Sequence, residues 1–147
     1  MPAVDLHLPP DVAYVGLARL VVCAAARVAG MAEERVEDLR VAASEATTNA
    51  MAAHNRDGHG APVVLSFGPT DSSFEVTIAD AGAGFDPEPA EALEDRDPLQ
   101  EGGLGVILIR GLADSVSFER GEGMRVNMRF QVGLQADGDR RQTSVDV

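Results

Sequence analysis

Apolar and polar residues follow one another along this chain with periods that predict five strands and three helices. Alternating apolar residues within 1–10 predict a first strand that ends at Pro9-Pro10, because proline removes a donor from a sheet. The same alternation, bounded by turn residues, predicts four further strands at residues 63–67, 74–78, 115–119 and 124–132. Residues 68–73 are expected to join two of these strands as a hairpin-like loop.

The first helix is expected from Asp11, which can act as its N-cap, to about Ala29. Gly30 is a suitable stop, since glycine readily adopts the left-handed conformation that follows many helices. Five apolar side chains are expected to pack inward from this helix: Val12, Val15, Leu20, Cys23 and Val28. A short helix over 104–112 is predicted later in the chain.

The second helix is expected from about Glu33 to His54. Apolar residues recur along it at spacings of three and four and define one stripe: Val36, Leu39, Ala43, Ala46, Ala50 and Ala53. Its many alanines predict close packing against a sheet. Glu45 and Asn49 are four residues apart, so they share a face beside the apolar stripe.

Length and composition indicate one domain over residues 1–132, followed by a polar tail at 133–147 that we expect to be disordered. The single cysteine, Cys23, lies among apolar residues and is expected to be a buried, unreactive thiol. The chain has no apolar run of about 18 residues and no basic, signal-like N-terminus. These features predict a cytoplasmic protein that does not contact a membrane.

The net charge of −12 argues against direct binding to nucleic acid, because the chain would repel phosphates. It favours basic protein surfaces as partners. Half of this charge falls between Asp86 and Glu101, where seven acids face one base, Arg96. Such a segment, rich in glycine, proline and acids, is typical of a loop or lid. A triphosphate bound here would need a metal and backbone N–H groups to offset its charge.

Four features along the chain carry candidate chemistry. Asn49 offers a carbonyl oxygen suited to Mg²⁺, and Glu45 one turn earlier is a candidate base. Asp80 follows a strand and can accept a hydrogen bond from an amino group such as that of adenine. Glycines then let the backbone approach a base or an anion: Gly82 and Gly84, and Gly102, Gly103 and Gly105 around Leu104.

Each of these features alone has an ordinary structural explanation. Asn49 can bond locally, Glu45 can be a solvated surface acid, Asp80 can form a turn, and the glycines can be a hinge. Their order within about sixty residues is what indicates a site for a magnesium nucleotide. The three histidines show no zinc-ligand spacing with Cys23, and no G-x-S-x-G elbow for a serine hydrolase is present.

The order E-x-x-x-N, D-x-G-x-G-F and G-G-L-G, followed by a final strand pair, resembles the Bergerat-fold ATPase domain. Glu45-Ala-Thr-Thr-Asn49-Ala and the segment from Gly105 to Val116 most resemble the anti-sigma factor serine/threonine kinases of the RsbW type. The resemblance covers roughly Val4 to Val132. It implies an α/β, or α+β, two-layer sandwich in which helices cover a mixed, largely antiparallel sheet.

The resemblance also implies roles for the candidate residues. Asn49 would be the Mg²⁺ ligand, Glu45 the general base and Asp80 the residue that reads adenine. ATP would be further held by the glycine segments: Gly82, Gly84, Gly103, Leu104 and Gly105. Members of the family sequester a sigma factor and phosphorylate a STAS-domain anti-anti-sigma partner on serine or threonine, and many of them are homodimers.

Glu101 is a departure from the family pattern. Well-studied kinases of the group carry an arginine at this position, two residues before Gly103-Leu-Gly105, and Arg96 or Arg110 would have to supply the missing cation. Two readings therefore stay open. The intact Glu45 and Asn49 favour a kinase that is also an anti-sigma factor, whereas Glu101 favours a sigma-sequestering module of the same fold with little or no kinase activity. A detached histidine-kinase catalytic domain is a third, weaker reading.

Overall fold

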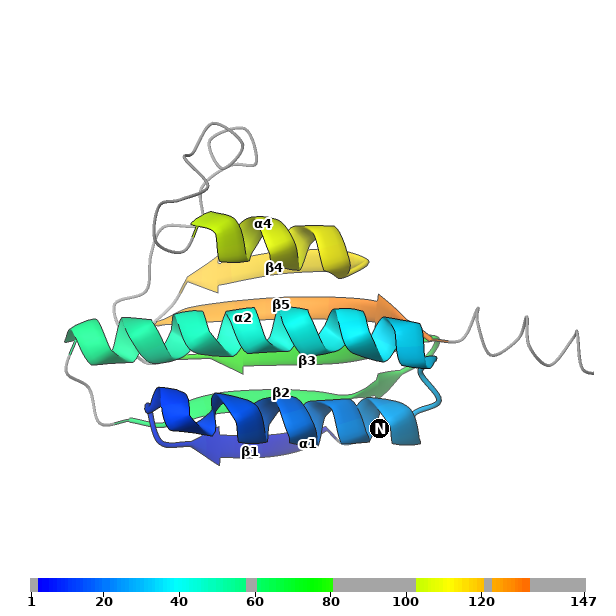
Figure 1. The fold of residues 1–147 in the computed structure, drawn as a ribbon, viewed down its shortest axis with the longest axis horizontal. Coiled ribbons are helices and arrows are strands. Elements are labelled where there is room, and N and C mark those ends of the chain that lie inside the picture. The colour runs from blue at the N-terminus through cyan, green and yellow to red at the C-terminus, as the bar shows by residue number, and fades with distance from the viewer. Residues whose placement is uncertain (1–2, 58–60, 81–102, 121–122, 133–147) are drawn as a thin grey trace, which may run out of the picture.

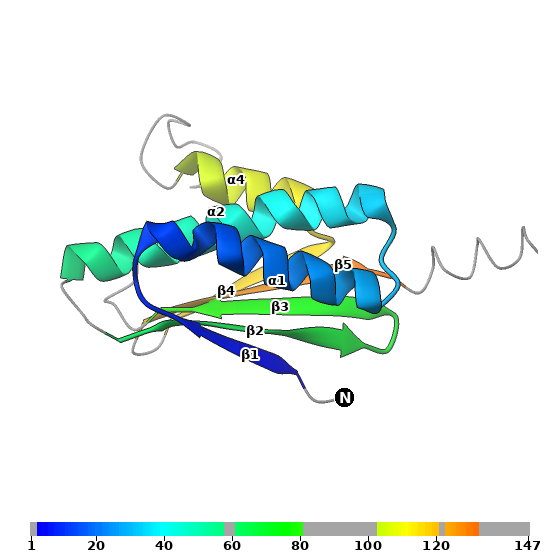
Figure 2. The ribbon, with the colours of Figure 1, turned by 60° about the horizontal axis from the view of Figure 1, so that its bottom comes forward.

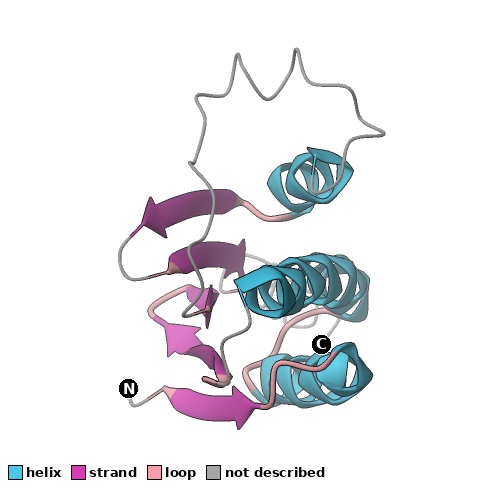
Figure 3. Cartoon of the chain, turned by 90° about the vertical axis from the view of Figure 1, so that its left-hand side faces the viewer, coloured by secondary structure: helices cyan, strands magenta, loops and turns pink. Residues whose placement is uncertain are grey.

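The protein is a two-layer sandwich in which helices cover one face of a single sheet. The computed structural model describes residues 3–57, 61–80, 103–120 and 123–132. An end-on view separates the two layers, with the strands on one side and the helices on the other (Figure 3). The two-layer fold expected from the sequence is therefore confirmed.

The sheet has five strands in the order β1-β2-β3-β5-β4, and all its pairings are antiparallel, where the resemblance implied a mixed, largely antiparallel sheet. The central strands pair in registers that place Val76 opposite both Phe67 and Met128. β4 joins only β5 and so forms one edge, and β1 forms the other. The bounds are β1 Val4–Leu8, β2 Val63–Thr70, β3 Ser73–Ala79, β4 Ser115–Arg120 and β5 Met124–Gln131.

The three α-helices in the described part of the chain lie side by side on the sheet, with α2 between α1 and α4 (Figures 1 and 2). Asp11 caps a short 3-10 turn, η1, by accepting a hydrogen bond from the Ala13 N–H at 2.9 Å. The expected first helix thus consists of this turn and α1. Gly30 follows it with a φ of 96°, the left-handed conformation that ends many helices. The bounds are η1 Val12–Tyr14, α1 Val15–Val28, α2 Glu33–Asp57 and α4 Gly103–Leu112.

The prediction of which side chains pack inward from the first helix is wrong at three of its five positions. Val12 and Leu20 are exposed, and Val28 keeps 90% of its surface exposed. Cys23 is buried as expected, and the other buried side chains of α1 are Ala18, Val22 and Ala26. The helix carries apolar residues on two faces, and the smaller ones face α2 and the sheet because they allow close approach.

The connection between β2 and β3 is shorter than the predicted loop over 68–73. The two strands extend until Thr70 pairs with Ser73, which leaves a two-residue turn. Asp71 in that turn has a φ of 37°, a left-handed conformation that aspartate tolerates better than most residues. Pro69 lies within β2 beyond the last residue that pairs with β1, so its missing N–H removes no bond to that strand.

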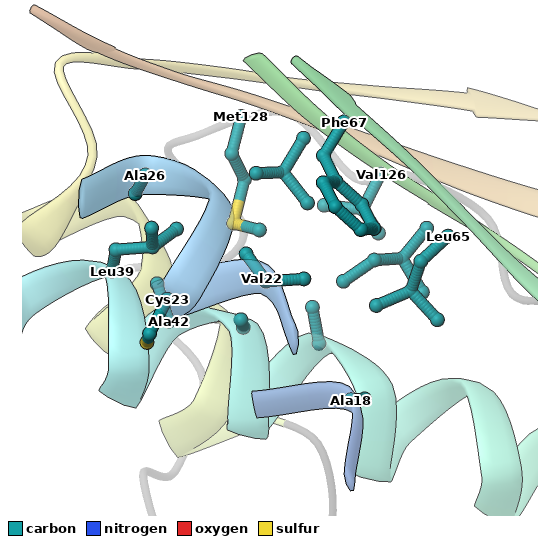
Figure 4. Close-up of a cluster of buried hydrophobic side chains, with 14 of the residues drawn as sticks. Ala18, Val22, Cys23, Ala26, Leu39, Ala42, Leu65, Phe67, Val126 and Met128 are labelled. Atoms are coloured by element: carbon teal, nitrogen blue, oxygen red, sulfur yellow. The ribbon is translucent and has the colours of Figure 1, made fainter. Parts of the chain in front are cut away.

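The core lies between the helices and the covered face of the sheet. Large apolar side chains from alternate positions of the central strands point into it and meet small residues of α1 and α2 (Figure 4). Its fully buried large members include Phe67, Phe74, Phe130, Leu39, Met51, Leu65 and Ile78. The predicted stripe of α2 is confirmed from Val36 to Ala50, and these alanines let the helix lie close to the strands.

Several sequence predictions lie outside the described residues. These are the acidic lid, Gly82 and Gly84 before it, and the tail at 133–147, so the domain boundary after residue 132 stays a prediction. Among the described helices, none has both the length and the apolar character needed to cross a membrane.

Candidate functional site

The site is built around two side chains of α2 and the start of α4. Glu45 and Asn49 are both partly buried on the flank of α2 that faces α4. Gly105 in the first turn of α4 approaches them so closely that a Cβ there would lie 3.0 Å from Glu45 Oε2 and 3.2 Å from Asn49 Nδ2. The glycine therefore brings a helix N-terminus against the carboxylate predicted as a base and the amide predicted as a Mg²⁺ ligand.

Asp80 enters the same region from the sheet. It follows the end of β3, as predicted, and its N–H donates to the Met124 carbonyl oxygen at 3.0 Å. In return the Met124 N–H donates to Asp80 Oδ1 at 3.4 Å. This reciprocal pairing with the first residue of β5 fixes the carboxylate at the rim of the sheet.

A narrow cavity of about 10 Å³ joins Asn49 to Asp80, with room for about one water molecule. Two small residues of α2, Ala46 and Ala50, leave the space open above the sheet. The other walls are apolar and come from β3, α4, β4 and β5: Ile78, Ile109, Phe118, Met124 and Val126. No sequence pattern predicts these walls, because they depend on which strands and helices become neighbours.

The polar groups here suit a ligand with an amino group at one end and an anion at the other. The Asp80 carboxylate can accept a hydrogen bond from an amino group beside apolar side chains, but an aromatic ring would enter only if the walls of the cavity moved apart. The first N–H groups of a helix have no partner within the helix, so those at the start of α4 suit phosphate oxygens. These polar groups match the chemistry of a nucleotide, although the cavity is far smaller than a nucleotide.

The donor set also fits a magnesium ion that binds together with phosphates. Asn49 presents an amide oxygen, a hard ligand of the kind Mg²⁺ takes. Within the described ranges, no group of three or more His, Cys, Asp or Glu residues could hold a metal alone. Mg²⁺ that binds with phosphates takes one or two protein ligands and completes its shell with phosphate oxygens and water, so Asn49 could be its protein ligand.

The remaining predicted residues divide into two groups. Gly103 and Leu104 form the first turn of α4 with Gly105, and the backbone of all three is described. Gly82, Gly84, Arg96 and Glu101 lie outside the described residues. Arg110, considered as a substitute cation, stacks over the Phe118 ring at 5.1 Å and so lies against β4.

Comparison with known proteins identifies the class to which this fold and site belong. The sequence profile of the histidine kinase-like ATPase domain matches residues 8–130, so the chain belongs to that family. Within it the chain is similar to the serine-protein kinase RsbW of Oceanobacillus iheyensis, with 35% identity over 85% of this chain and 84% of the relative. The RsbW of Bacillus subtilis is 32% identical over 92% of this chain and 90% of the relative. The resemblance to RsbW-type kinases is thereby confirmed.

Solved structures agree on the fold. The RsbU and RsbW domains of Rv1364c from Mycobacterium tuberculosis match with a TM-score of 0.67 and 14% identity, over 90% of this chain and 33% of that one. The SiaB-SiaC complex from Pseudomonas aeruginosa contains a chain that matches with a TM-score of 0.59 and 14% identity, over 86% of this chain and 87% of that one. At these identities the likeness concerns the fold alone.

Proposed function

We propose that this protein is a cytoplasmic anti-sigma factor with ATP-dependent serine/threonine kinase activity, which sequesters a sigma factor and phosphorylates a STAS-domain anti-anti-sigma partner. The observation that carries the proposal is the close packing of Gly105 against Glu45 and Asn49, with Asp80 on the same cavity. The relatives named serine-protein kinase RsbW support it.

The residues would divide the reaction between them. Asp80 would hold the adenine, the first turn of α4 would bind phosphate oxygens, and Asn49 would hold Mg²⁺, which neutralises phosphate charge when bound. Glu45 would accept the proton of the partner's serine or threonine hydroxyl. That hydroxyl oxygen forms a bond to the γ-phosphorus as the bond from the γ-phosphorus to the bridging oxygen breaks, and ADP leaves.

A transfer assay with Mg-ATP and purified STAS-domain partners tests this proposal. Glu45→Gln keeps the size of the side chain and removes the base, so transfer should slow by about 10²–10⁴-fold while ATP still binds. Asp80→Ala should weaken ATP binding itself. Transfer that continues at the wild-type rate in Glu45→Gln would exclude Glu45 as the base.

The second candidate function is a sigma-sequestering module without kinase activity, and Glu101 favours it. The RsbW-type kinases that the chain resembles carry an arginine at this position, which would attract phosphate. A glutamate at the same position would repel it. The same assay separates the two functions. If the wild-type protein binds a sigma factor tightly but neither binds ATP nor transfers phosphate, the second candidate function is supported and the kinase is excluded.

A further inference from the structure

Arg35, near the start of α2, binds the end of α4 that is opposite the candidate nucleotide site. Its side chain keeps only 19% of its surface exposed. Its Nη1 donates to the carbonyl oxygen of Leu112, the last residue of α4, at 3.1 Å. Carbonyl groups in the last turn of a helix lack partners within the helix and carry partial negative charge, so a guanidinium is a favourable partner there.

The same guanidinium also binds the turn between α4 and β4. Arg35 Nη2 donates to Asp114 Oδ2 at 2.6 Å, and this oxygen also accepts from the Gln131 N–H at 2.7 Å. The Asp114 N–H in turn donates to the Arg129 carbonyl oxygen at 2.9 Å. Asp114 therefore ties α4 to the end of β5 and to α2 at once.

Two further contacts hold Arg35 in place. Its Nη1 donates to Asp38 Oδ2 at 2.6 Å, one turn along α2. Its guanidinium carbon lies 5.2 Å from the centre of the buried Phe130 ring. We call the group of Arg35, Asp38, Asp114 and the Leu112 carbonyl the Arg35 clasp. Multidentate, partly desolvated contacts of this kind fix geometry far better than a single surface ion pair.

The chain holds a natural comparison for the clasp. Arg27 and Glu33 form an ion pair at 2.7 Å that joins the end of α1 to the start of α2, but their side chains are 48% and 68% exposed. Water and salt screen such a pair, and it contributes little. It lies on the α1 side of α2, away from α4.

Helices α2 and α4 run antiparallel (Figure 1). Both ends of α4 contact α2. At one end Gly105 contacts Glu45 and Asn49, and at the other the Arg35 clasp holds Leu112. Arg35 and Asn49 are separated by roughly 21 Å along α2, at a rise of 1.5 Å per residue. A short helix that is fixed at both ends can neither slide nor turn against its neighbour, whereas release of one end allows both movements.

We propose that Arg35 and Asp114 are positioning residues for the nucleotide site. By holding the C-terminal end of α4, they keep its first turn at the distance from Glu45 and Asn49 that phosphate and metal binding require. This inference rests on the proposed function for its ligand, and it assigns a role in ATP affinity to two side chains that do not touch the site.

The test measures Mg-ATP affinity by calorimetry in Arg35→Gln and Asp114→Asn, with Arg27→Gln as the control of equal charge change. The temperature is kept well below the unfolding midpoint of each variant, so that only folded protein is titrated. Arg35→Gln should bind Mg-ATP about tenfold more weakly than the wild type, and Arg27→Gln within about twofold of it. The double variant of Arg35 and Asp114 should be little weaker than Arg35→Gln, because both remove one contact network.

A merely structural role for the clasp predicts a different result. The unfolding temperature would fall in Arg35→Gln while the affinity for Mg-ATP stayed at the wild-type value, and that outcome would overturn the inference. Arg35→Lys is the second variant if Arg35→Gln does not fold. It keeps the charge but not the fork of donors, and it should restore part of the lost affinity.

Hydrogen exchange separates failure of this inference from failure of the proposed function. If the wild type binds no ATP, the proposed function fails, and exchange of the amides at 103–112 then decides the inference. Faster exchange at the start of α4 in Arg35→Gln than in Arg27→Gln supports a clasp that acts along the helix. Equal exchange in the two variants contradicts it.

Discussion

The two flanks of α2 differ in chemistry, and we expect them to differ in role, one contributing to stability and the other to ligand binding. The flank toward α1 is buried and mostly apolar: Val36, Ala43 and Thr47 are buried, and Cys23 of α1 lies against Val36. The flank toward α4 is polar and only partly buried, with Arg35, Glu45 and Asn49. Substitutions on the first flank should change the free energy of unfolding, and substitutions on the second should change ligand affinity.

The largest effect is expected at Met51, which is fully buried four residues after Thr47. Met51→Ala leaves a cavity in the core and should lower the free energy of unfolding by about 2–5 kcal/mol, as measured by urea denaturation. The protein that remains folded should bind Mg-ATP with wild-type affinity. A large loss of affinity in the folded fraction would break the separation between the flanks.

Gly105→Ala tests the other flank. The new Cβ would lie 3.0 Å from Glu45 Oε2, so this side chain and Asn49 must move. ATP affinity should fall roughly tenfold, equivalent to about 1.4 kcal/mol, when measured by calorimetry. The free energy of unfolding should change little, because two effects oppose each other. Alanine is a better helix former than glycine, whereas the close contact of its Cβ with Glu45 and Asn49 is unfavourable.

Gly111→Ala is the matched control in the same helix. A Cβ at Gly111 has no atom within 4 Å, so the substitution should stabilise α4 and leave ATP affinity unchanged. If the two glycine variants affect affinity equally, the contact at Gly105 has no special role in the site.

Thr47→Val tests the buried flank of α2 that faces α1. The Thr47 hydroxyl is fully buried and has no hydrogen-bond partner among the described residues. Replacing it by a methyl group of similar size should raise the free energy of unfolding by about 1 kcal/mol in urea denaturation. The neighbouring Thr48 is exposed, and Thr48→Val should change stability by less than about 0.5 kcal/mol. Destabilisation by Thr47→Val would mean that the hydroxyl has a partner.

The smallest effect concerns the buried thiol of Cys23. Burial raises the pKa of this thiol above its usual 9.0, although the charges of Arg27 and Arg40 oppose the shift. Above pH 9 the unfolded chain therefore releases a proton that the folded chain retains, so stability should fall as pH rises, by roughly 1.4 kcal/mol per pH unit at most. In Cys23→Ala, the free energy of unfolding measured by urea denaturation should fall less steeply with pH above pH 9. Identical slopes in both proteins would contradict the raised pKa.

The sequence predicted the parts of the molecule that local patterns determine. The spacing of Glu45 and Asn49 placed them on one face of α2, and Asp80 was expected directly after its strand. The buried face of α1 was mispredicted because its apolar residues fit two helical faces, and only packing against α2 selects one.

Contacts between distant segments could not be predicted from one sequence. Met124 pairs with Asp80 across 44 positions, and Asp114 meets Arg35 across 79. No periodicity or spacing reports such pairs, because they follow from strand order and from the place of α4 on the sheet. The places of Glu45, Asn49 and Asp80 in the fold were thus predictable, and their roles stay predictions. The apolar walls of the cavity and the supporting contacts could not be predicted.

The central claim is that the flank of α2 toward α4 binds a magnesium nucleotide. The most direct measurement is a calorimetric titration of the wild type with ATP, with and without Mg²⁺, beside Asn49→Ala and Asp80→Ala. The account predicts binding that depends on Mg²⁺ and weakens in both variants, with the dependence on Mg²⁺ lost in Asn49→Ala. Absence of ATP binding in the wild type, or equal binding in all three proteins, would contradict it.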